Sequence, residues 1–85
     1  MASGGAEPAN AEDYFGLGMV FSAGAGVAID LVQAHKWFNI AASRGHKDAA
    51  QMSDSEIGCA QRAARDWLKT HPQAPALVAR TRVAA

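Results

Sequence analysis

The chain has 85 residues, of which 49% are hydrophobic and 19% are charged, and its formal net charge is zero. This length and composition fit one domain, and they exclude two independent cores as well as a wholly disordered chain. The single cysteine, Cys59, excludes a disulfide within one chain.

Residues 1–9 are rich in Gly, Ala and Ser without periodicity, which predicts a flexible leader. They have neither the basic region nor the apolar region of a secretory signal, and no apolar stretch approaches the length that spans a bilayer. We therefore expect a cytoplasmic protein without a membrane partner. The lone thiol of Cys59 fits a reducing compartment, and we expect it to be a small buried or half-buried residue rather than a nucleophile.

Apolar side chains recur at helical spacing from residue 11 to residue 23, which predicts the first helix. Asn10 precedes it as an N-cap, and two carboxylates in the first turn complement the helix dipole. Gly16 and Gly18 each cost such a helix about 1 kcal/mol relative to Ala. Their presence indicates that a neighbouring helix packs closely against the bare backbone.

The segment 24–27 has the sequence Gly-Ala-Gly-Val, which predicts a helix end followed by a turn. Asp30 and Gln33 have the spacing of a capping box at the start of the next helix. We predict that this second helix spans residues 31–44 and ends at Gly45.

An apolar stripe that ends at Thr70, shortly before Pro72, predicts a third helix. Ser53 and Glu56 have the spacing of a second capping box and mark its expected start. Residues 46–52 fit either a separate short turn or the beginning of a longer helix that runs through Ser53, and a break is the favoured interpretation.

Residues 72–85 contain two short apolar pairs without a clear period. We therefore predict a tail that is disordered or docks in trans onto another chain. The helical domain itself is expected to span residues 10–71.

One unit of this domain has a recognisable pattern: Leu-Gly, an aromatic residue, a Gly-x-Gly-Val turn, an Asp, an Ala-x-x-Trp-Phe helix, two Ala and a Gly. In residue type and spacing, residues 11–50 resemble a Sel1-like repeat, a relative of the tetratricopeptide repeat. The residues that carry the pattern are Leu17, Gly18, Phe21, Gly24, Gly26, Val27, Asp30, Ala34, Trp37, Phe38, Ala41, Ala42 and Gly45. The resemblance implies an all-α fold of the α-α superhelix type, in which an antiparallel helix-turn-helix is followed by a third, capping helix.

Residues 52–67 are similar to the closing segment of some bacterial Sel1-like proteins. The family would continue after residue 50 with a full first helix of the next repeat, so the second repeat looks abridged. The surface behind the helix of Trp37 is then only partly covered. Because such repeats bury their apolar faces against stacked neighbours, we expect either an unusually packed cap or a chain that completes its core by self-association.

The resemblance implies a scaffold or adaptor that binds another protein, and the groove beside the first helix or an uncovered apolar edge is the expected surface. The candidate partner-binding residues are Trp67 and Leu68 with the basic Arg62 and Arg65. The alternative is a nucleic-acid-binding domain that uses the basic third helix and tail. A predicted pairing of Arg62 with Asp66, together with the zero net charge, weakens that alternative.

The sequence offers no arrangement that predicts catalysis, a cofactor or a metal. Ser43, His46 and Asp48 lie around a helix end without the strand-turn-helix elbow that exposes a nucleophilic serine. His35, His46 and His71 are scattered and have no partner at zinc-ligand spacing. We therefore expect a protein that is not an enzyme.

Overall fold

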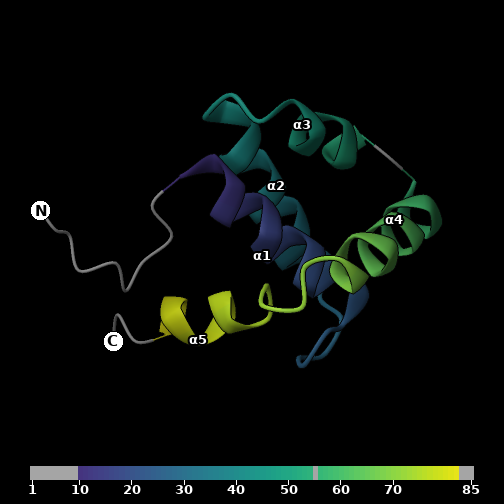
Figure 1. Cartoon of the computed structure of the whole chain (residues 1–85). Helices are drawn as coiled ribbons and strands as arrows, with labels where there is room; N and C mark the ends of the chain where they lie inside the picture. Colours follow the sequence, from purple (N-terminus) through teal and green to yellow (C-terminus); the bar gives the residue numbers. More distant parts are fainter. Residues whose placement is uncertain (1–9, 55, 83–85) are drawn as a thin grey trace, which may run out of the picture.

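The computed structural model describes residues 10–54 and 56–82, and five helices form within these two ranges (Figure 1). They are α1 (Ala11–Ala23), α2 (Leu31–Ser43), α3 (Lys47–Asp54), α4 (Ile57–Lys69) and α5 (Ala76–Arg82). These two ranges contain no strand, which confirms the predicted all-α class. None of the described helices is both long and apolar enough to cross a bilayer. The predicted leader over residues 1–9 lies outside the described residues.

α1 begins and ends where the sequence predicts. The Asn10 side-chain oxygen accepts a hydrogen bond from the Asp13 backbone N–H at 3.0 Å, which satisfies one of the N–H groups left open at a helix start. Gly24 follows the last turn with a φ of 73°, and its N–H donates to the Val20 carbonyl at 2.9 Å. Glycine accepts this left-handed conformation at little cost, so it ends the helix here.

α2 has its predicted N-cap but ends one residue before the predicted boundary. The Asp30 carboxylate accepts from the Gln33 backbone N–H at 3.1 Å. Arg44 is the C-cap rather than the last helical residue, and Gly45 follows it with a φ of 96°.

α1 and α2 lie side by side and run in opposite directions (Figure 1). At one end of the pair, the Asp30 N–H donates to the Phe21 carbonyl at 3.1 Å. At the other end, the Arg44 guanidinium lies 5.1 Å from the centre of the Tyr14 ring, where it makes a cation–π contact. The predicted antiparallel helix pair is therefore present.

Apolar side chains of the two helices come together across this pair. Leu17 and Phe21 of α1 share an apolar cluster with Trp37, and Phe21 also contacts the cluster that contains Phe38. A Cβ atom at Gly18 would overlap the Phe38 ring. The absence of a side chain at Gly18 thus lets the two helices approach closely, as the sequence indicates.

α1 is the central helix of the fold, because α2, α4 and α5 all pack against it. Phe15, Leu17, Met19 and Val20 are each no more than 3% exposed. A helix that is apolar on most of its sides is typical of a buried position. The additional neighbours account for Gly16, which faces α4 and α5 rather than α2.

The third predicted helix is the largest departure, because two helices occupy its place. α3 begins at Lys47 and runs through Ser53 to Asp54, so the segment is a helix rather than a short turn; it is separate from α4, as the favoured interpretation has it, but the break lies after Asp54. The predicted capping box is also wrong: the Ser53 hydroxyl donates to the Asn39 side-chain oxygen at 3.0 Å, and Glu56 makes no side-chain bond at the start of α4. The physical reason is that the ring of His46 caps an earlier helix start.

The prediction for Cys59 is wrong as well, since this residue is exposed on α4. The buried positions of the helix are Ala60 and Ala64, one turn apart. Cys59 lies beside this stripe and faces solvent.

The described part of the tail is helical rather than disordered. Residues 76–82 form α5, which docks on α1 of the same chain. Ala74, Leu77 and Val78 are 7%, 9% and 7% exposed, and they pack into a cluster with Leu17 and Val20. These three positions have the i, i+3, i+4 spacing of a helix face, a signal present in the sequence but brief.

Candidate protein-binding groove

The candidate site is a groove that α3 and α4 leave between them. α3 packs mainly against α2, whereas α4 packs against α1, so the two helices diverge (Figure 1). The groove between them has a volume of about 280 Å³. Its lining residues are Phe15, Met19, Asp48, Gln51, Met52, Ala63 and Trp67.

The floor of the groove comes from α1 and is held by aromatic packing. Phe15 is only 3% exposed, and its ring lies 5.8 Å from that of Phe38 between centroids. The ring of His46 stacks on Phe15 at 4.3 Å, and Trp67 meets it edge-on at 5.6 Å with an interplanar angle of 88°. Edge-to-face packing of this kind is a favoured aromatic geometry. The floor is therefore a fixed apolar surface.

The walls combine apolar side chains with a polar rim. Met52 of α3 and Ala63 of α4 line the walls, while Asp48 and Gln51 provide the polar atoms. Methionine is flexible and polarisable, so it adapts to partners of irregular shape. An apolar centre with a polar rim is also the usual anatomy of a protein interface.

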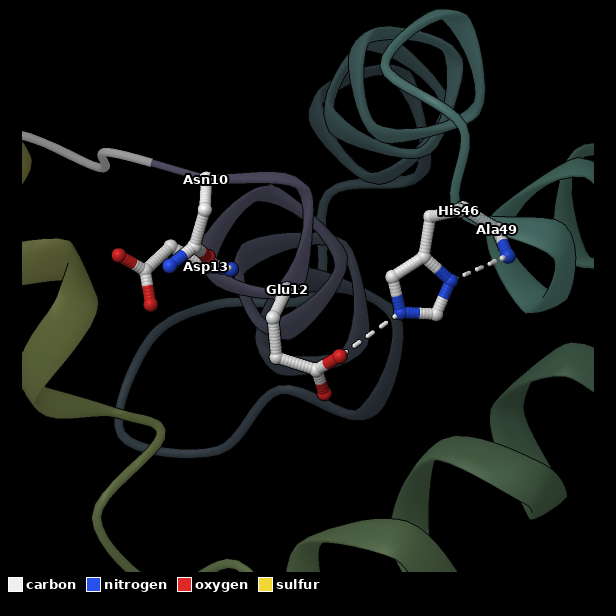
Figure 2. A network of polar contacts seen from close by, with 5 residues as sticks. All are labelled: Asn10, Glu12, Asp13, His46 and Ala49. Atoms are coloured by element: carbon white, nitrogen blue, oxygen red, sulfur yellow. Dashed lines mark hydrogen bonds and ion pairs between the residues drawn. The ribbon is translucent and has the colours of Figure 1, made fainter.

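His46 sets the position of α3 relative to α1 (Figure 2). Its Nδ1 atom accepts from the Ala49 backbone N–H at 3.2 Å, so the imidazole acts as an N-cap. Because a neutral imidazole carries one proton, this bond places the proton on Nε2. Nε2 then donates to Glu12 at 3.0 Å, which ties the start of α3 to the first turn of α1.

The sequence did not identify this role of His46, because histidine is not among the residues that commonly cap helices. The only local signal is the position of His46 directly after Gly45, where a helix ends. Its contact with Glu12 joins residues 34 positions apart, which no local pattern predicts.

Of the four predicted partner-binding residues, only Trp67 lines the groove. Its ring is half-buried and stacks on His71 at 3.8 Å with an interplanar angle of 5°. Leu68 packs instead into the cluster beneath α5, and Arg62 and Arg65 are exposed on α4.

The predicted partner of Arg62 has a different neighbour in the structure. The Asp66 carboxylate lies 3.9 Å from the Lys69 amine, and both side chains are exposed. The predicted i, i+4 pair is thus replaced by an i, i+3 contact, which is worth little at the surface.

The thirteen residues of the repeat pattern serve to shape the helix pair. Leu17, Ala34, Phe38 and Ala41 are buried in the two clusters. The glycines Gly24, Gly26 and Gly45 take φ values of 73°, 79° and 96° at the turns. The other six pattern residues lie between the two helices, at the start of α2 or in the loop that joins α1 to α2. They are Gly18, Phe21, Val27, Asp30, Trp37 and Ala42.

A second hollow, of about 450 Å³, lies between α1, α2 and α5 beside Trp37. Tyr14 stacks on Trp37 at 5.8 Å, and the Lys36 amine lies 4.9 Å from the centre of the indole. The Trp37 Nε1 atom is buried and has no hydrogen-bond partner among the described residues. Burial of an unpaired donor is unfavourable, so this atom lowers the stability of the packing around Trp37.

The side chains considered for catalysis or metal binding are engaged separately. The Ser43 hydroxyl donates to the Ile40 carbonyl at 2.8 Å, whereas His46 contacts Glu12 and Ala49. In the described ranges, no group of three or more His, Cys, Asp or Glu side chains gathers where it could hold a metal.

Comparison of the chain with protein-family models, with curated proteins and with solved structures gave no match.

Proposed function

We propose that this protein is a non-catalytic interaction module of the Sel1-like repeat type, and that it binds an apolar segment of another protein between α3 and α4. The observation that supports the proposal best is the groove itself. Its floor of Phe15 and Met19 belongs to the core and is 3% and 2% exposed, and the half-buried Met52, Ala63 and Trp67 line the hollow above it. A partner segment that fills the hollow would bury the remaining exposed surface of Met52, Ala63 and Trp67.

The resemblance to Sel1-like repeats supports the same function. In such folds each helix pair stacks on the next one, and an abridged second repeat leaves a neighbour missing. α3 has only eight residues, which is consistent with an abridged first helix of a second repeat. The partner then takes the place of the missing helix.

The test compares a variant inside the groove with a matched variant outside it. Ala63→Arg places a long charged side chain in the groove wall, and Ala50→Arg places the same side chain on the exposed side of α3. Proteins retained by immobilised wild-type chain from cell extract are identified, produced in pure form and titrated against all three chains by calorimetry.

We expect Ala50→Arg to bind like the wild type and Ala63→Arg to bind at least tenfold more weakly, with a negative heat-capacity change for the wild type as apolar surface is buried. Circular dichroism of each variant verifies that the helices are intact. Equal affinities of the two variants contradict the proposal.

Nucleic-acid binding remains the alternative, and the described residues offer little in its favour. Arg62 and Arg65 are exposed on α4, but the neighbouring Trp67 ring is half-buried, with Phe15 edge-on and His71 stacked against it. Salt separates the two functions: an apolar interface persists at raised ionic strength, whereas binding through phosphates weakens steeply.

A further inference from the structure

His46 joins the first turn of α1 to the start of α3 through the two nitrogens of its ring (Figure 2). Nδ1 accepts from the Ala49 backbone N–H at 3.2 Å, and Nε2 lies 3.0 Å from a Glu12 carboxylate oxygen. The ring is held in place, because its side chain is only 13% exposed and it stacks on Phe15 at 4.3 Å. The bond from Ala49 requires a free electron pair on Nδ1, so this cap exists only while the imidazole is neutral.

Protonation of His46 affects its two hydrogen bonds in opposite ways. The imidazolium ion has an N–H group at each nitrogen, so Nδ1 then faces the Ala49 N–H as a second donor and the cap is lost. The positive charge also lies at the N-terminus of α3, where the helix dipole favours negative groups. Nε2 continues to donate to Glu12, now in a charge-assisted bond. The ring therefore stays with α1 and releases α3.

The helices around the ring carry few charged side chains near it. They are Glu12 in the first turn of α1, Arg44 at the end of α2, and Lys47 and Asp48 in the first turn of α3. Arg44, Lys47 and Asp48 are exposed to solvent. From α4, the uncharged Trp67 packs edge-on against the ring of Phe15. Glu12 is thus the charged group that the structure places in hydrogen-bond contact with His46.

α3 is short enough to depend on this cap. It has eight residues, fewer than an isolated helix needs to be stable in water. Ala49 is its one fully buried residue, and Met52 packs beside it against the first apolar cluster. Because Asp48, Gln51 and Met52 of α3 line the groove, a change at the start of this helix also changes that wall.

We propose that His46 is a pH-dependent cap of α3: the neutral ring holds the first turn of the helix, and the protonated ring releases it while it stays bonded to Glu12. An ordinary imidazole changes its charge between about pH 5 and about pH 8. The cap therefore stabilises α3 at the upper end of this range and is lost as the pH falls. This inference goes beyond the proposed function, because it concerns the order of α3 and needs no partner.

The test follows the wild-type chain by nuclear magnetic resonance from about pH 8 to about pH 5. Long-range proton–nitrogen spectra report which nitrogen of His46 carries a proton. Amide hydrogen exchange reports the protection of Ala49 and Ala50, whose N–H groups donate to the ring and to the carbonyl of His46.

We expect Nδ1 to be unprotonated at the upper pH. The protection factors of both amides should fall roughly fivefold across the range, as the loss of a helix cap implies. This fall should have the same midpoint as the titration of the His46 ring signals.

Two variants separate this role from a merely structural one. His46→Asn retains a capping oxygen that does not titrate in this range, so its protection factors at Ala49 and Ala50 should not depend on pH. His71→Gln removes a second imidazole, which stacks on Trp67, and should behave like the wild type. Far-ultraviolet circular dichroism verifies that both variants are helical. Should His46→Asn fail to fold, the comparison of midpoints in the wild type still decides.

Three results would overturn the proposal. The first is wild-type protection at Ala49 and Ala50 that stays constant while the ring of His46 titrates. The second is a folded His46→Asn chain whose protection falls with pH as that of the wild type does. The third is an Nδ1 atom that already carries a proton at the upper pH.

Discussion

At the scale of single residues, close packing around α1 makes two of its glycines structural. A helix normally gains stability when an interior glycine becomes alanine, by about 1 kcal/mol. That gain holds where the new methyl group has space, and it is reversed where a neighbour already occupies the position. The sequence alone identified these glycines as a cost, and the structure identifies the neighbours that offset it.

Gly18→Ala and Gly58→Ala are therefore expected to have opposite effects. At Gly18 the new methyl group overlaps the Phe38 ring, and overpacking of a core costs about 1–3 kcal/mol. At Gly58 on α4 no atom lies within 4 Å, so the substitution should raise the free energy of unfolding by about 0.5–1 kcal/mol. Urea denaturation of both variants measures the difference, and a stabilised Gly18→Ala chain would contradict the packing described here.

The imidazole of His46 is the second residue with an effect beyond its own position. His46→Ala removes the cap of α3, the bond to Glu12 and the stack on Phe15, and we expect a loss of about 1–2 kcal/mol. His46→Asn keeps a capping oxygen and should recover part of this loss.

The matched change on the other side of the contact is Glu12→Gln. It retains an oxygen that accepts from His46 Nε2, and this side chain is 63% exposed, so the effect should stay below about 0.5 kcal/mol after solvent screening. Thermal melts of the three variants give the order, and equal losses for His46→Ala and His46→Asn would argue against a capping role.

At the scale of helices, the sequence predicted α1 and α2, which have residues that commonly cap helices. The boundaries of α1 and α2 have the capping residues Asn10, Gly24 and Asp30. Such residues mark the start or the end of a helix in the local sequence. α3 begins at a histidine cap and α5 is only two turns long, so neither has a strong local signal. A groove beside the first helix was expected, but the residues of its walls were not identified, because they depend on where α3 ends and α4 begins.

The α2 cap provides a test at this scale. Asp30→Ala removes the oxygen that accepts from Gln33, and we expect the free energy of unfolding to fall by about 1 kcal/mol. Asp30→Asn retains an acceptor and should be close to neutral. Equilibrium denaturation followed by far-ultraviolet circular dichroism distinguishes the two, and a neutral Asp30→Ala would show that packing alone fixes the start of α2.

At the scale of the whole molecule, one central helix connects two apolar clusters. The first contains Phe15 and Phe38, and the second contains Leu17 beneath α5. Trp67 contacts both. Residues of the two clusters alternate along α1, so both clusters pack on the same helix. Loss of packing in one cluster therefore also affects the other cluster through α1.

Loss of α5 packing should therefore lower the stability of the entire domain rather than release only the C-terminal segment. Val78→Asp places a carboxylate in the second cluster, where the wild-type side chain is 7% exposed, and the expected loss is about 2–3 kcal/mol. Ala79→Asp, on the exposed side of α5, should change stability by less than about 0.5 kcal/mol. Amide hydrogen exchange is the informative measurement. Because α1 serves both clusters, Val78→Asp should reduce protection in α2 as well as in α1, and unchanged protection in α2 would mean that the two clusters unfold independently.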